Sequence, residues 1–335
     1  MKVPSMIFKF LCLFVWSLAT AFVQAQTAAN EPVPLRVHVF RGASNAPIYM
    51  GIEKGYFAQQ GIKPVVSFTP NSDVLRAGLA EGQFEIAHGG VDNAVAMVEV
   101  AKKDVVILMG GEGGMMQLLV RPEITQISDL KGRNFVVDAA STAYSLLGQK
   151  IFKQAGLLPV KDYNIVPLGG SESRTNALAT PEGSSTMNFA PWAVIATDRG
   201  AKSLGRTIDL YGPYQGTGMW TLRSWAQQNS QLVERYIAAY VQGCRAIFDP
   251  GQKDLTIRVL QRELQVDQRM ASITYDELLV PGSGLSKDCA FNMQGFRNLL
   301  AIRAEMLGAW GGQAPAPDKY LDLSYYNRVL QTLKP

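Results

Sequence analysis

The chain has 335 residues, of which 47% are hydrophobic and 18% are charged. This composition excludes a disordered chain, and the length exceeds what one hydrophobic core usually serves, so two lobes are expected. Lys and Arg number 32 against 28 Asp and Glu, with no long run of like charge. That balance argues against an electrostatic nucleic-acid binder, and we expect no nucleic-acid partner.

The first 25 residues have the pattern of a secretory signal peptide. A basic start precedes an apolar run over 10–23, and Val23 and Ala25 occupy the −3 and −1 positions of a cut before Gln26. The apolar run is shorter than the ~20 residues of a membrane span, which favours a cleaved leader over an anchor. We therefore expect a signal peptide at 1–25 and a mature chain in the periplasm.

The predicted mature chain contains two cysteines. Cys244 lies in a helical pattern, and Cys289 follows a loop. So few cysteines are typical of an exported protein that relies on its core rather than on a disulfide framework. One disulfide and two buried thiols are equally compatible with the sequence.

Short apolar runs alternate with helical segments from residue 35 to 109, which indicates an α/β lobe. The expected strands are 35–40, 64–68, 84–87 and 105–109, and the expected helices are 46–59, 74–79 and 94–101. Strands separated by single helices favour parallel pairing. Open sheets of this kind bind ligands beyond the carboxyl ends of their strands.

The alternation restarts after an extended piece at 117–121 and a turn at 129–132. The expected strands here are 134–138, 164–168 and 186–189, and the expected helices are 143–155, 173–179 and 193–199. Segments 208–211 and 219–222 flank a glycine-rich return crossing, beyond which the pattern is almost wholly helical. We expect the domains to be lobe 1 at 34–115 plus 218–335, lobe 2 at 116–213, and hinge crossings near 110–121 and 208–222.

Catalytic and metal motifs are absent from the sequence. His38 and His88 are the only histidines, and each lies in an apolar strand pattern without a partner motif. The glycine-rich run 110–114 lacks the Lys-Ser/Thr of a phosphate-binding loop. Its glycines, Gly113 among them, predict either close approach to a ligand or a hinge. We expect no enzyme activity, no cofactor and no metal.

Five segments carry a resemblance to a known family. They are 45–57 (NAPIYMGIEKGYF), 60–65 (QGIKPV), 79–90 (LAEGQFEIAHGG), 127–138 (ISDLKGRNFVVD) and 154–158 (QAGLL). In this order they resemble periplasmic solute-binding proteins of the NMT1/THI5-like class, whose ligands include sulfonates, nitrate, taurine and thiamine precursors. One departure lies in 177–191, where an acidic position usual in the family has become Ser or Thr, so ligand identity does not transfer.

The resemblance implies a type II-like periplasmic binding fold, α/β and two-lobed, with mostly parallel sheets and a ligand cleft between the lobes. It implies a monomer that binds a small-molecule ligand and presents it to an ABC permease in the inner membrane. We expect a small organic anion, sulfonate-like, taurine-like or a carboxylate. The alternatives are an aromatic or pyrimidine ligand and a sensor without a transport role. A pyrimidine-synthesising enzyme is disfavoured, because the Cys-rich iron motif of those relatives has no counterpart here.

Three loops at strand ends form the candidate ligand site. Helix N-termini have unpaired N–H groups and partial positive charge, so they suit carboxylates and sulfonates. The loops 41–45, 89–93 and 140–142 supply the candidates Arg41, Ser44, Asn45, Asp92, Ser141 and Thr142. The hydroxyl groups either cap their helices or donate to an anion, and Asp92 either caps or binds the amino group of a zwitterion. Arg41 either contacts the ligand or is solvated.

Aromatic candidates complete the predicted site. Tyr49 lies one helical turn past Asn45, and Asn188, Phe189 and Trp192 close a strand of the second lobe. An aromatic surface would bind an apolar or ring-bearing part of a ligand, although core packing accounts for these residues equally well. Thr217 lies in the return crossing and is expected to touch ligand as the hinge closes.

Overall fold

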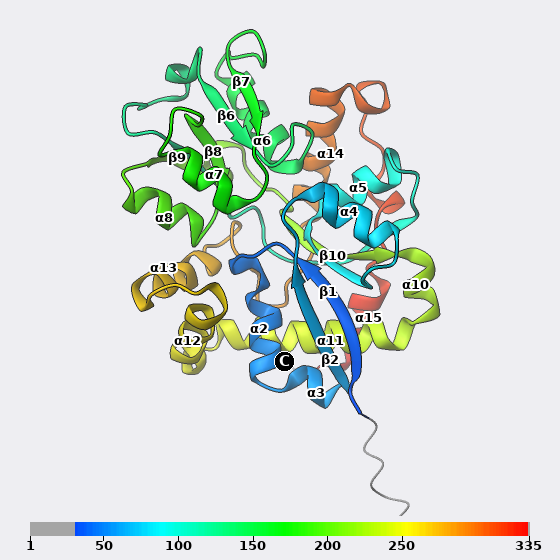
Figure 1. The fold of residues 1–335 in the computed structure, drawn as a ribbon. Helices are drawn as coiled ribbons and strands as arrows, with labels where there is room; N and C mark the ends of the chain where they lie inside the picture. The colour runs from blue at the N-terminus through cyan, green and yellow to red at the C-terminus, as the bar shows by residue number, and fades with distance from the viewer. Residues whose placement is uncertain (1–30, 334–335) are drawn as a thin grey trace, which may run out of the picture. The chain divides into compact units, whose positions relative to one another are not determined.

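The computed structural model describes residues 31–333, so the predicted leader lies outside the described residues. From Pro34 onward the chain forms one unit that contains two five-stranded sheets (Figure 1). The part of the chain that the structure describes has no helix that is long and apolar enough to cross a membrane.

The first sheet has the strand order β2-β1-β3-β10-β4. Its strands are β1 (Val33–Val39), β2 (Ile62–Phe68), β3 (Ile86–Gly90), β4 (Val105–Gly110) and β10 (Thr217–Leu222). β1 and β3 are parallel, whereas β10 is antiparallel to both of its neighbours, β3 and β4. β10 is therefore a reversed strand inserted between two strands of common direction, and it returns the chain to this sheet.

The second sheet repeats this plan with the order β7-β6-β8-β5-β9. Its strands are β5 (Gln117–Val120), β6 (Asn134–Val137), β7 (Asn164–Pro167), β8 (Ser185–Asn188) and β9 (Lys202–Arg206). β6 is parallel to both β7 and β8, and β5 is the reversed strand, antiparallel to β8 and β9.

Helices connect the strands of each sheet. Those associated with the first sheet are α2 (Ala46–Glu53), α3 (Tyr56–Gln59), α4 (Ser72–Ala80) and α5 (Val91–Glu99). Those associated with the second are α6 (Ala143–Gln154), α7 (Ser171–Ala177), α8 (Trp192–Asp198) and α9 (Thr207–Leu210). Three short 3-10 turns lie at Ala43–Asn45, Ile127–Leu130 and Pro250–Gln252, and two more lie at Ala309–Gly312 and Pro317–Lys319.

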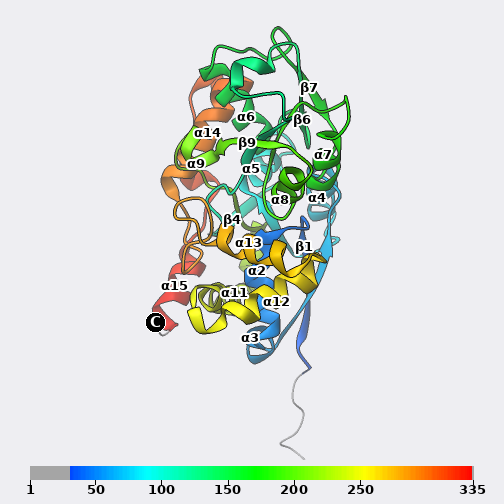
Figure 2. The same ribbon diagram turned by 90° about the vertical axis from the view of Figure 1, so that its left-hand side faces the viewer.

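The chain after β10 is helical, as the sequence predicts. It forms α10 (Arg223–Gln228), α11 (Ser230–Phe248), α12 (Lys253–Leu264), α13 (Gln268–Leu278), α14 (Met293–Leu307) and α15 (Ser324–Thr332). Buried Tyr236, Tyr240 and Cys244 share one face of α11, which packs against α2 and α15. α14 packs against α6 of the second sheet, and both views place it there (Figures 1 and 2). The predicted lobe boundaries stay a prediction, and α14 shows that the C-terminal helices serve both sheets.

Two segments of the structure differ from the prediction. The single helix expected over 46–59 is two helices, because Gly55 between α2 and α3 has a φ of 70°, which glycine adopts without strain. The segment 208–211 lies largely in the helical turn α9, and the strand that precedes it, β9, was not predicted. β9 is polar and half exposed, so it lacks the apolar signal on which the prediction depends.

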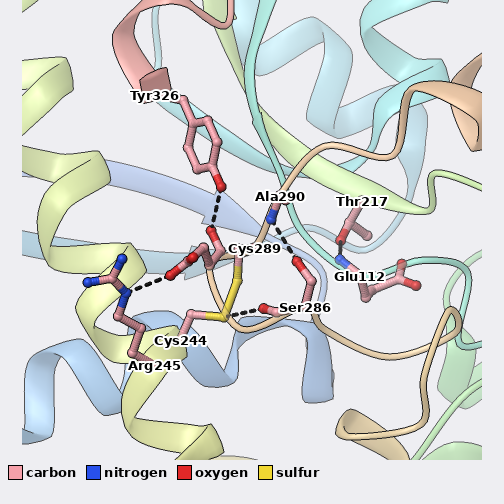
Figure 3. The surroundings of a disulfide bond; sticks show 9 residues. Glu112, Thr217, Cys244, Arg245, Ser286, Cys289, Ala290 and Tyr326 are labelled. Carbon is pink, nitrogen blue, oxygen red and sulfur yellow. Dashed lines mark hydrogen bonds and ion pairs between the residues drawn. A yellow bond between two sulfur atoms is a disulfide. The ribbon is translucent and has the colours of Figure 1, made fainter. Parts of the chain in front are cut away.

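Two crossings connect the sheets and are held together by hydrogen bonds. The first follows β4 and the second precedes β10. The N–H groups of Gly216 and Thr217 donate to the Glu112 carbonyl at 3.0 and 3.3 Å, and the Glu112 N–H donates to Thr217 Oγ1 at 3.2 Å (Figure 3). The two crossings therefore run side by side at Glu112.

Cys244 and Cys289 form a disulfide, which decides the alternative that the sequence leaves open (Figure 3). The bond ties α11 to the loop between α13 and α14. The same loop contacts the first crossing, since the Gly113 N–H donates to the Ser283 carbonyl at 3.0 Å. The disulfide thus stabilises a loop that packs on the connection between the sheets.

Candidate functional site

A cavity of about 80 Å³ lies between residues of both sheets and the crossings. Helices that begin beside it follow the strands, as expected at the carboxyl ends of a parallel sheet. Its lining includes first-turn residues of four helices, namely Ser72 of α4, Asp92 of α5, Ala143 of α6 and Ser171 of α7. The fold therefore brings the N-termini of helices from the two sheets to one place.

Much of the cavity wall is apolar. Aromatic and methionine side chains contribute to it from both sheets and from the first crossing, and they are Phe40, Met115, Met116, Phe135, Met187 and Phe189. Such walls exclude water and fit the organic part of a ligand. The charged lining residues are few, and their environment determines what else the cavity can bind.

Arg174 is a buried cation in this lining. Its residue is 6% exposed, and its guanidinium donates to the Gly169 carbonyl at 2.7 Å, to Ser171 Oγ at 3.3 Å and to the Met187 carbonyl at 3.4 Å. All three acceptors are neutral, and among residues 31–333 no carboxylate forms an ion pair with it. Burial lowers the pKa of Arg174 to about 10, so the group stays charged at neutral pH.

Asp92 is the most deeply buried carboxylate of the cavity, at 1% exposure. Its Oδ2 accepts from Arg303 Nη1 of α14 at 3.3 Å, and the same Nη1 donates to the Ser141 carbonyl at 3.3 Å. The pKa of Asp92 is raised to about 6, because burial, with a smaller contribution from Asp138, outweighs the lowering effects of Arg303, Arg76 and the Ala143 N–H. Oδ1 of Asp92 has no hydrogen-bond partner in the described part of the chain.

Glu112 and Asp138 are the other carboxylates of the lining. Glu112 accepts from the N–H groups of Gly114 and Met115 and from the Tyr144 hydroxyl, the last at 2.9 Å. Burial raises its pKa, against these donors. Asp138 follows β6 and is half-buried, and its Oδ1 is buried without a hydrogen-bond partner within residues 31–333. Glu112 is therefore satisfied by the protein, and Asp138 is not.

Five of the sequence candidates line the cavity, and they are Ser44, Asp92, Thr142, Phe189 and Thr217. The sequence predicts that an anion binds at the helix N-terminus near Ser141 and Thr142, but there the carboxylate of Asp92 interacts with this helix start. The Ala143 N–H at the start of α6 lowers the pKa of Asp92, and Thr142 Oγ1 donates to the Ala139 carbonyl at 2.8 Å rather than capping α6.

The remaining candidates are not among the lining residues, and each has a protein partner. Asn45 Nδ2 donates to the Phe40 carbonyl at 2.6 Å, and Tyr49 is buried. Arg41 stacks over Phe68 at 4.1 Å. The backbone partner of Gly113 is the loop described above.

On the second-sheet side, the Asn188 side chain donates to the Ser171 carbonyl and to Thr175 Oγ1, each at 2.9 Å. Trp192 Nε1 donates to the Arg41 carbonyl at 3.4 Å. Ser141 offers its carbonyl to Arg303. Ligand contacts by these residues stay predictions.

His88 lines the cavity but is held as a structural residue. Its Nε2 lies 3.0 Å from the Tyr236 hydroxyl, and its ring stacks on Tyr240 with centroids 4.7 Å apart. Burial lowers its pKa to about 3, so it is neutral. No group of three His, Cys, Asp or Glu side chains within residues 31–333 is arranged to hold a metal.

Sequence reasoning did not find Arg174, Asp138, Tyr144 or Arg303. Arg174 follows a short polar segment without a motif, and Arg303 is 211 residues from its partner Asp92. Asp138 ends a predicted strand, which is the signal that could have identified it.

Comparisons with known proteins agree with this architecture. The chain matches the family model described as "NMT1/THI5 like" over residues 43–253. The protein YtlA of Bacillus subtilis is 22% identical over 219 residues, and the match spans 63% of this chain and 65% of that relative.

Solved structures share the fold. The alkanesulfonate-binding protein SsuA of Xanthomonas axonopodis pv. citri, bound to MOPS, aligns with a TM-score of 0.69 and 18% identity over 89% of this chain and 99% of that one. The periplasmic nitrate-binding protein NrtA of Synechocystis PCC 6803 aligns with a TM-score of 0.74 and 13% identity over 91% and 90% of the two chains.

The two sheets, each with one reversed strand and flanking helices, define a periplasmic binding protein fold. The chain belongs to the NMT1/THI5-like family.

Proposed function

We propose that this protein is the substrate-binding component of an ABC importer and captures a small organic anion in the cavity between its sheets. In this proposal the mature chain is a periplasmic monomer without enzyme activity, and it presents its ligand to an inner-membrane permease. The names of its structural relatives, a sulfonate-binding and a nitrate-binding protein, support the assignment to transport.

The observation that supports an anion is the buried guanidinium of Arg174, which donates hydrogen bonds only to neutral acceptors. A buried charge without a hydrogen-bonded counter-ion is costly, and a ligand anion in the cavity would offset part of that cost. Guanidinium also donates two parallel hydrogen bonds to a carboxylate or sulfonate. The apolar wall next to it, with Phe135 and Met187, fits an organic group better than it fits a bare inorganic ion.

Thermal unfolding of the refolded, ligand-free mature chain tests this proposal. The panel contains alkanesulfonates, small carboxylates, nitrate, aromatic acids and pyrimidines. An anion at a thousand times its dissociation constant should add about 4 kcal/mol to the free energy of unfolding. Stabilisation by organic anions supports the proposal, and stabilisation by uncharged pyrimidines alone contradicts it.

Two variants test whether the anion binds at Arg174. Arg174→Met should abolish the stabilisation, because it removes the buried cation. Arg258→Met on α12 is the control, since Arg258 is exposed and far from the lining in sequence. Equal stabilisation of both variants would remove Arg174 from the site.

A further inference from the structure

We propose that the ligand also carries a protonated amino group, which Asp92 and Asp138 hold while Arg174 holds its anionic end. This inference rests on the function proposed above and names the class of ligand as a small zwitterion. It follows from the carboxylate oxygens that the protein leaves without donors.

The charges of the lining do not balance around a simple anion. Asp92, Glu112 and Asp138 line the cavity together with one lining arginine, Arg174. Glu112 receives three hydrogen bonds from the protein, so it does not need a ligand. Asp92 and Asp138 remain, and they would repel a negative group of the ligand that lay beside them.

Both aspartates have an oxygen that lacks a donor. Oδ1 of Asp92 belongs to a side chain that is 1% exposed, and Oδ1 of Asp138 is likewise buried; neither has a hydrogen-bond partner among the described residues. An ionised carboxylate only accepts hydrogen bonds, so the missing partners must be donors. Buried polar atoms are almost always paired in native proteins, which makes two such oxygens in one cavity a sign of a ligand.

Both carboxylates belong to the lining of one cavity, Asp92 in the first turn of α5 and Asp138 directly after β6. Their charges interact, since Asp138 contributes to the raised pKa of Asp92, and the charge of Asp138 also favours the charged form of Arg174. An ammonium group has three donors, which fit the two free oxygens and leave one for a further acceptor.

The position of Arg303 keeps Asp92 ionised without covering it. Arg303 reaches Asp92 from α14 and bonds Oδ2, which leaves Oδ1 available. The second contact of Arg303, with the Ser141 carbonyl, fixes the guanidinium at the start of α6. A cationic group of the ligand would thus complete the coordination of Asp92 rather than compete for it.

Calorimetric titration of the full mature chain with matched ligand pairs tests the inference. Taurine and isethionate differ only in an amino group that replaces a hydroxyl, and β-alanine and 3-hydroxypropionate form the corresponding carboxylate pair. We expect the amino compound of at least one pair to bind about ten- to a hundredfold more tightly, the effect of a charge-assisted hydrogen bond.

Variants test whether Asp138 and Asp92 cause the preference for the amino compound. Asp138→Asn should reduce the preference to within about threefold and leave the fold intact, because Asp138 forms no ion pair among residues 31–333. Asp92→Asn should also reduce the preference, and Asp254→Asn, an exposed change on α12, should keep the wild-type preference. Unchanged preference in both cavity variants would overturn the assignment.

The outcomes separate this inference from the function on which it rests. Equal binding of both members of each pair would overturn the inference and leave the organic-anion proposal standing. No binding of any of the four compounds, together with no stabilisation by the anion panel, would overturn both.

Discussion

Reduction of the disulfide should destabilise the protein by an amount that the loop length sets. Cys244 and Cys289 are 45 residues apart in sequence and are both fully buried. Closing a loop of that length lowers the entropy of the unfolded chain by an amount worth about 4 kcal/mol at 25 °C. For a protein of this size the midpoint of thermal unfolding should fall by about 6 °C.

The assay is thermal unfolding with and without a phosphine reductant. The control is the double variant Cys244→Ser with Cys289→Ser, which lacks the bond and should not respond to reductant. The reasoning is refuted if the wild-type midpoint is unchanged while a thiol titration shows that both cysteines have been reduced.

Two other predictions concern the buried charges. Arg303→Met should lower the free energy of unfolding in urea by about 3–5 kcal/mol, because it leaves Asp92 buried without its partner, whereas Arg258→Met should change it by less than about 0.5 kcal/mol; equal losses would contradict this. Since burial raises the pKa of Asp92 to about 6, affinity for an amino-bearing ligand should fall as pH drops from 7.5 to 5, and Asp92→Asn should show a flat profile. The stability of the ligand-free protein should change with pH in the opposite direction. Above pH 6 the buried, ionised Asp92 opposes folding, and its protonation should raise the free energy of unfolding as the pH falls from 6 to about 4, the pKa of Asp in the unfolded chain. A pH-independent affinity in the wild type would contradict the role of Asp92.

Much of the architecture was predictable because it depends on local patterns. The strands β3, β4 and β6 are short buried runs, and β1 alternates buried with more exposed residues; hydrophobic periodicity detects both patterns. β9 is polar and half exposed, so the same method misses it.

The candidate site was predictable mainly where a residue follows a strand. Ser44, Asp92 and Thr142 were found by that rule, and all three line the cavity. Arg303 comes from a helix near the end of the chain, and its approach to Asp92 depends on how α14 packs on α6. The sequence also could not show that Arg303 joins Asp92 to the start of α6 through the Ser141 carbonyl.

A crystal structure of the mature chain with the organic anion that stabilises it most would test the central claim most directly. The account predicts the anionic group in the cavity, with an oxygen about 2.8 Å from a guanidinium nitrogen of Arg174. An anionic group bound outside this cavity, or one inside it that makes no contact with Arg174, would contradict the account.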